Sequence, residues 1–249
     1  MKKIISFLIS LAILGACSGP NEELTTQVSI KFLHNWNDTP ILIRDLNTIK
    51  FTNANGELLS IERIRYIVSN VVLINNENEI YELSKYQLID FGDNEVIINA
   101  DEVPLGSYKL SFIFGFTDRD NTDGIYQDLN SNSFNVPRML GGGYHFMQFD
   151  GKYLNENNQE TGFNYHMIRA VNVSGTNNQV FQDTSFKVDL GVISIANNDE
   201  IKIKTDLSEW FKNPNTWDLN QLNTLLMPNF NAQVLMNQNG KSVFSLIQD

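Results

Sequence analysis

Residues 66–74 read YIVSNVVLI, a nearly continuous apolar run that is too short to span a membrane and has the length of a buried β-strand. Upstream, residues 28–34 (VSIKFLH) alternate apolar and polar side chains. Downstream, residues 108–116 (YKLSFIFGF) carry aromatic residues at alternate positions. Because successive side chains of a strand point to opposite faces, both patterns are typical of strands with one face on a core.

Similar β-type segments continue along the chain and are separated by turn signals such as Asn55-Gly56 and Asp150-Gly151. The further strand candidates are residues 86–91, 96–98, 144–149, 163–173, 186–195 and 201–204. Helical patterns are expected only late, as one capped turn after Asp206 and two short helices at residues 219–226 and 230–237, separated by Pro228. The pattern predicts an all-β, single-domain β-sandwich or barrel-like fold over residues 28–249, with a few short helices near the C-terminus.

The first residues have the composition of a bacterial export signal. Two lysines precede an apolar stretch at residues 4–14, and small residues lead to Cys17, the one cysteine of the chain. This ending resembles the lipobox at which a signal peptidase cleaves before a lipidated cysteine. We therefore expect a lipoprotein signal peptide at residues 1–16 and a lipidated flexible tether at residues 17–27. Such a protein is exported and anchored in the bacterial envelope, on the periplasmic side or on the outer face of the outer membrane.

Composition excludes several classes of function. Eighteen basic against 29 acidic residues give a net charge of −11, which repels phosphate backbones and argues against a nucleic-acid partner. The single cysteine excludes an internal disulfide, a cysteine-based zinc site and an iron–sulfur cluster within this chain. The sequence has no phosphate-binding loop and no Gly-x-Ser-x-Gly elbow, so no catalytic motif indicates an enzyme.

Imidazole chemistry depends on three histidines, His34, His145 and His166. The alternation of residues 28–34 is expected to point His34 to the core side, with Trp36 on the same face two residues later. A single histidine in a strand is more often a hydrogen-bonded core residue than a ligand. All three, however, lie in aromatic-rich β segments and not in the Asn-rich loops, which favours a shared metal site.

The methionines beside these histidines differ in their expected direction. Period two places His145 and Met147 on one face, and a thioether beside an imidazole suits copper better than a hard cation. Around His166 the same alternation sends Met167 to the opposite face, where we expect it to pack in the core. Met147 is therefore the candidate sulfur ligand.

Nearly the whole mature chain resembles the MbnP-like family of periplasmic and envelope copper-binding proteins. The matching stretches are residues 28–34, 66–73, 103–112, 139–151 (MLGGGYHFMQFDG) and 163–166 (FNYH), with a tail that contains Trp210-Phe211, Pro214, Asn239-Gly240 and Val243-Phe244. The resemblance implies a β-rich single domain and a copper site at His34, His145 and His166. Some members carry an oxidised tryptophan at the copper site, for which Trp36 is the nearest candidate by its face. The segment after Met139 lacks the tryptophans that many relatives carry there, and Asp150 replaces a more usual glutamate.

The leading hypothesis is an envelope lipoprotein, held on the membrane through Cys17, that binds copper for storage, delivery or scavenging at a mononuclear histidine site. One alternative is a zinc site of three histidines with an open fourth position. Another is a metal-free surface module that binds a glycan or a protein. Residues 118–124 (DRDNTDG) resemble the front of a calcium loop, but Leu129 stands where an EF-hand needs glutamate, so we expect a solvated turn in that segment.

Overall fold

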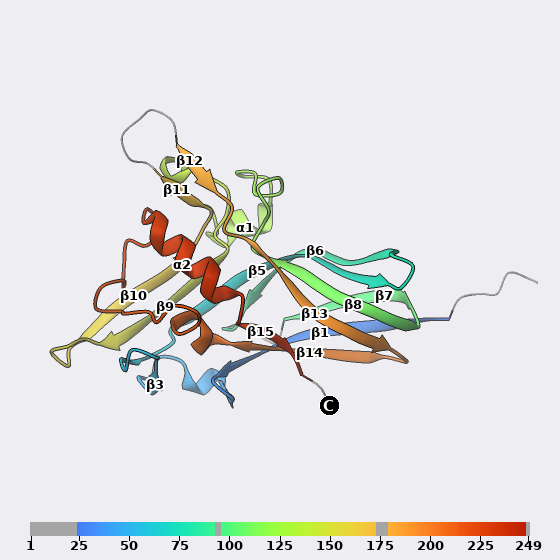
Figure 1. The fold of residues 1–249 in the computed structure, drawn as a ribbon, viewed down its shortest axis with the longest axis horizontal. Coiled ribbons are helices and arrows are strands. Elements are labelled where there is room, and N and C mark those ends of the chain that lie inside the picture. Colours follow the sequence, from blue (N-terminus) through green and yellow to red (C-terminus); the bar gives the residue numbers. More distant parts are fainter. Residues whose placement is uncertain (1–23, 93–95, 173–178, 248–249) are drawn as a thin grey trace, which may run out of the picture.

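The computed structural model describes residues 24–92, 96–172 and 179–247, which form two facing β-sheets with helices at one end (Figure 1). The expected signal peptide, the lipidation site Cys17 and most of the tether lie outside the described residues. Within the described part, no helix is both long and apolar enough to cross a bilayer.

The smaller sheet is organised around the N-terminal strand β1 (Thr25–Trp36). This strand pairs in parallel with β14 (Asp199–Asp206) and antiparallel with β7 (Ile97–Pro104) and β2 (Thr39–Pro40). The C-terminal strand β15 (Phe244–Leu246) completes the sheet by pairing with β14. The two ends of the described chain therefore meet in one sheet.

The larger sheet is organised around β5 (Arg63–Asn75), which contains the apolar run at residues 66–74. On one side β5 pairs with β8 (Gly106–Phe114), which in turn pairs with β13 (Phe186–Ile195). At residues 63–66 the same edge of β5 pairs with β9 (Met147–Leu154), and β9 forms a hairpin with β10 (Glu160–Met167). The remaining members are β3 (Phe51–Thr52), β4 (Leu58–Leu59) and β6 (Ile80–Asp90).

Aromatic side chains join the two sheets. Phe32 of the small sheet packs against Tyr66 and Phe112 of the large sheet, with ring centroids 6.2 and 5.9 Å apart. Each aromatic side chain removed from water in this way contributes roughly 1.5–3 kcal/mol. The predicted sandwich or barrel-like all-β class is confirmed.

Two of the three expected helical segments form. Asp206 accepts a hydrogen bond from Ser208 N and caps a 3-10 turn at Leu207–Phe211. Asn229 caps α2 (Phe230–Gly240) by accepting from Ala232 N. The helix predicted at residues 219–226 is wrong. That segment consists of turns that begin after Asp218, whose side chain accepts from Asn220 N and competes with helical hydrogen bonding.

The helices and a small hairpin lie at the end of the larger sheet. Figure 1 shows α2 beside the hairpin of β11 (Ala170–Asn172) and β12 (Val180–Gln182), close to the strands β9 and β10. A short helix that the sequence pattern did not predict, α1 (Gln127–Ser131), and two 3-10 turns at Ile43–Asp45 and Arg138–Leu140 complete the described elements. The long loop between β8 and β9 therefore lies near α2, and this arrangement positions the candidate site.

Candidate metal centre

The strand register of the larger sheet decides which predicted ligands can meet. Tyr66 on β5 stands opposite Met147 on β9, while Arg65 stands opposite Gln148, which also faces His166 on β10. Paired residues share a face and consecutive residues point to opposite faces. Tyr66 and Met147 therefore face the sandwich core, whereas His166 faces the other side of the sheet.

His34 lies on the core side and is separated from the other two histidines by the sheet. Its Nε2 atom is 3.1 Å from the hydroxyl of Tyr66, and its ring packs on Phe91 with centroids 4.7 Å apart. Burial lowers the pKa of His34 to about 3, so the ring is neutral at physiological pH. His34 also lines an apolar cavity of about 480 Å³ between the sheets. The expectation that all three histidines share one site is therefore corrected, although the predicted direction of His34 is right.

His145 is placed by a bend and not by a strand. Gly143 has φ of +80°, and a Cβ atom there would lie 2.5 Å from Oδ1 of Asn121, so this position requires glycine. The same Asn121 Oδ1 accepts a hydrogen bond from Tyr144 N at 2.8 Å. Because β9 begins only at Met147, the period-two alternation expected through residues 144–149 does not extend to His145.

The ring of His145 is buried and held at both nitrogens. Its Nδ1 atom is 2.9 Å from the carbonyl oxygen of Phe134, and its Nε2 atom is 3.2 Å from the sulfur of Met227. Burial lowers the pKa of His145 to about 4, against the opposing effect of the Phe134 carbonyl. The ring is neutral at pH 7, and since a carbonyl oxygen only accepts, the single proton belongs on Nδ1. Nε2 consequently carries a lone pair.

His166 is oriented by a carboxylate. Its Nε2 atom is 2.8 Å from Oδ1 of Asp150, which also accepts from Asn164, while Arg63 binds the other oxygen, Oδ2. Burial alone would raise the pKa of Asp150, but the contacts with His166, Asn164 and Arg63 lower it to about 2. The Asp150 carboxylate accepts a hydrogen bond from Nε2–H of His166, which leaves Nδ1 as the ring nitrogen available to a metal. Partners of this kind orient metal-binding histidines and raise their basicity.

The two rings form an adjacent pair on this outer face. The centroids of His145 and His166 are 5.3 Å apart and their planes are nearly perpendicular, at 87°. Within the described ranges, no cluster of three or more His, Cys, Asp or Glu side chains has the geometry to hold a metal ion. The donor set is therefore two imidazoles, one of them in contact with a thioether, which fits a soft late first-row metal better than a hard cation.

Gln233 of α2 ties the pair to the loop that carries Met227. Its fully buried side chain donates to the carbonyl oxygens of His166 and Leu226, at 2.9 and 3.0 Å, and accepts from Ile168 N at 2.8 Å. These contacts fix the backbone of His166 and the residue before Met227 relative to each other.

Two other predicted site residues are core residues. Met147 is fully buried and paired with Met167 across the hairpin, which places both sulfurs on the core face, away from His166. Trp36 is buried between Phe51 and Phe211, and its indole nitrogen donates to Thr52 O at 3.0 Å. Met147 is therefore not the sulfur beside the histidine pair, and Trp36 is a packing residue.

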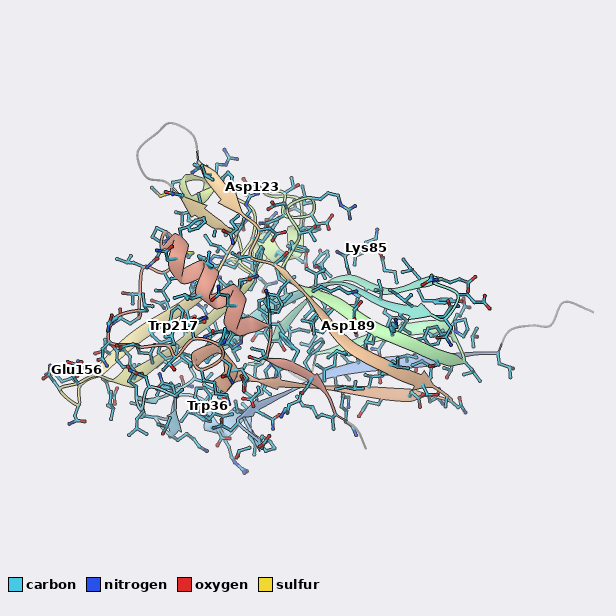
Figure 2. The ribbon with its side chains drawn as sticks, in the orientation of Figure 1. Trp36, Lys85, Asp123, Glu156, Asp189 and Trp217 are labelled. Carbon is cyan, nitrogen blue, oxygen red and sulfur yellow. The ribbon has the colours of Figure 1, made fainter. Side chains whose placement is uncertain are left out.

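The loop that resembles a calcium site is used for structure. Asp118 contacts Arg169 at 3.4 Å, and Asp120 accepts from Thr117 at 2.9 Å. Asp123 lies near the glycine turn before His145 and pairs with Arg138 at 3.4 Å. In Figure 2, Asp123 is at the end of the molecule that carries β11 and β12, far from Trp36. These contacts give the acidic side chains protein partners and position the turn.

Met227 was not predicted as a site residue. It lies in a loop between Leu226 and Pro228, far along the chain from either histidine, and no regular spacing connects it to them. It directly precedes Pro228 and the helix cap Asn229, and no local pattern marks it as a ligand.

Comparisons with known proteins agree with this architecture. A family model described as MbnP matches residues 25–229. The solved structure of MbnP from Methylosinus trichosporium is similar, with a TM-score of 0.60, 13% identity, and coverage of 90% of this chain and 98% of that chain. At this identity the likeness shows the fold alone. No curated protein matches the chain.

Proposed function

Because the chain belongs to the MbnP family, which is linked to copper handling, we propose that it is a non-enzymatic copper-binding protein whose ligands are His145 and His166. The observation that supports this proposal is the adjacency of two imidazoles with ring centroids 5.3 Å apart, one just before β9 and the other near the end of β10. In each ring one nitrogen is hydrogen-bonded to a protein oxygen, and the other nitrogen is the candidate metal ligand.

Copper is favoured over zinc by the donor set. A catalytic zinc site of the three-histidine type would need His34, which contacts Tyr66 on the opposite face of the sheet. Two imidazoles with a nearby thioether suit copper, which also heads the affinity order of divalent first-row metals for nitrogen sites. A copper ion held by His145 and His166 would supply redox-capable coordination chemistry, and the roles proposed for the site are storage, delivery or scavenging.

The residues around the pair have separate tasks in this proposal. The Phe134 carbonyl binds Nδ1–H of His145, and Asp150 binds Nε2–H of His166, so each ring is oriented with its other nitrogen left for the metal. Burial of His145 keeps it neutral as the pH falls toward 5, since its pKa is about 4. The protein therefore prepares the ligands before the metal arrives.

Metal analysis tests this proposal. The mature protein, purified without chelator and loaded with copper, is expected to hold one copper per chain, with nitrogen hyperfine structure in the electron paramagnetic resonance spectrum of the oxidised sample. A double His145→Ala and His166→Ala variant should lose this copper. His34→Gln, which retains a hydrogen-bonding group toward Tyr66, is the matched control and should load normally.

Two results would defeat the proposal: no stoichiometric copper in the wild-type protein, or equal loading in the double variant. Either result would favour the metal-free surface module, with the histidines serving as structural residues.

Export and anchoring are a separate part of the proposal. The lysines, apolar stretch and small residues before Cys17 support a lipid anchor in the bacterial envelope. Expression in bacteria with radiolabelled palmitate should label the wild-type protein and leave Cys17→Ser unlabelled. Equal labelling of the two, or none in the wild type, would contradict the anchor.

A further inference from the structure

The sulfur atom of Met227 lies against Nε2 of His145, so two atoms that can both bind a metal are in contact. Phe134 O accepts a hydrogen bond from Nδ1–H of His145, so Nε2 is the ring nitrogen left for a metal, and it lies 3.2 Å from the Met227 sulfur. A thioether has no proton to donate. In the opposite tautomer the unprotonated Nδ1 would face the carbonyl oxygen, a stronger acceptor than sulfur. Two potential donor atoms thus lie 3.2 Å apart, a separation that a cation bound to both of them would explain.

The geometry points to Met227 as a direct sulfur ligand that makes the copper site selective for Cu(I) over Cu(II) and zinc. This inference rests on the copper site proposed above and adds a ligand and a redox preference to it. Thioether ligands select Cu(I), whereas imidazoles alone accept zinc and Cu(II) as well. The sulfur is therefore the part of the donor set that distinguishes the metals.

The observed separation suits two ligands of one metal. Metal–nitrogen bonds near 2.0 Å and metal–sulfur bonds near 2.3 Å place the two donor atoms about 3.2–3.5 Å apart for bond angles of about 95–110°. The 3.2 Å between Nε2 and the sulfur is at the narrow end of this range. A small movement of the thioether opens the angle, and methionine, with three rotatable bonds, makes such movements easily.

The backbone on both sides of Met227 is held by hydrogen bonds. Leu226 is buried and its carbonyl oxygen accepts from Gln233, which also donates to His166 O. On the other side, Asn229 caps α2. The Met227 side chain itself is only half-buried, which leaves a route for the metal from solvent. The backbone is fixed while the side chain stays accessible, as expected for a ligand and not for a core residue.

Two other methionines of the same hairpin cannot bind a metal beside His145 and His166. Met147 and Met167 are fully buried on the core face of the sheet and pair with each other across the β9–β10 hairpin. Met139, by contrast, is exposed on the loop before the glycine turn, with 77% of its surface accessible. Met139→Leu is therefore a control for the loss of an accessible methionine sulfur, and Met227→Leu is the test variant of nearly equal volume.

The experiment is an anaerobic competition for Cu(I) with a chromophoric chelator, bicinchoninate, together with X-ray absorption of the Cu(I)-loaded protein. Removal of partners that only orient metal ligands lowers metal affinity by about 10–100-fold, so loss of a direct ligand should cost at least tenfold. We expect Met227→Leu to lower Cu(I) affinity by at least that factor, to leave zinc affinity unchanged, and to lose a copper–sulfur scattering shell near 2.3 Å. Met139→Leu should match the wild type in all three measurements.

Failure of the sulfur ligand and failure of the copper site give different results. If the wild-type protein loads copper but shows no copper–sulfur shell, and Met227→Leu binds Cu(I) as tightly, the sulfur ligand is refuted and the histidine site stands. If the wild-type protein does not load copper at all, the proposed function fails and the sulfur ligand falls with it.

Discussion

Acidification should destabilise the metal-free protein through His34, even though this residue lies outside the metal centre. Its pKa is about 3 in the folded state because of burial, against 6.5 for the exposed ring. The unfolded chain therefore binds a proton between these two values and the folded chain does not. The stability contributed by the neutral ring is complete above pH 6.5 and is lost as the pH falls toward 3.

The size of the effect follows from the two pKa values. At pH 4.5 the unfolded ring is about 99% protonated and the folded ring almost entirely neutral, which costs about 3 kcal/mol relative to a pH well above 6.5. His145, with a folded pKa of about 4, adds its own loss over much of the same range. A comparison with a variant is therefore needed to isolate His34.

The assay is urea unfolding of chelator-treated protein at pH 7.5 and pH 4.5, for the wild type and His34→Gln. His34→Gln is expected to be less stable at pH 7.5, since it packs less well on Phe91, but to lose about 2–3 kcal/mol less on acidification. Nuclear magnetic resonance titration of the His34 ring should show no protonation above pH 4.5. A ring that titrates near pH 6.5 in the folded protein, or equal acid losses in the two proteins, would refute the reasoning.

Three further changes test how the site is built. Asp150→Asn keeps the side-chain size but removes the charge that orients the imidazole of His166. Competition with a chelator should show a copper affinity about 10–100-fold lower than that of the wild type. An unchanged affinity would mean that the carboxylate does not orient a ligand. Gly143→Ala should lower the free energy of unfolding in urea by about 1–3 kcal/mol more than Gly124→Ala. Both positions have positive φ, but only at Gly143 would the added Cβ atom collide with a side chain, at Asn121 Oδ1. Equal losses of stability in the two variants would argue against this close approach. Gln233→Leu removes three buried hydrogen bonds, so we expect a loss of at least about 2 kcal/mol together with weaker copper binding, and a variant of wild-type stability and affinity would contradict its bracing role.

Much of the fold was predictable because β patterns report local burial. The strand at Phe186–Ile195 matches its predicted range, and the apolar run at residues 66–74 lies within β5 as expected. The directions of His34 and Met167 toward the core were also right, since both lie in regular alternating strands. Alternation is reliable wherever the strand is regular.

The site was harder to predict because it depends on departures from regularity. The bend before β9 turns the His145 ring to the outer face, so the alternation that paired it with Met147 does not apply. Met227 reaches the site through a loop held by Gln233, a tertiary contact with no local sequence signal. Alternation within β1 shows that His34 faces the core. It does not show that His145 and His166 lie on the outer face of the other sheet, so the sequence alone predicts one site for all three.

The most direct measurement is anomalous X-ray diffraction at the copper edge from crystals of the copper-loaded mature protein. A single strong peak within bonding distance of ring nitrogens of both His145 and His166 is the predicted result. A peak at His34, or no peak beside the pair in crystals that contain stoichiometric copper, would contradict the assignment of the copper site to these two residues.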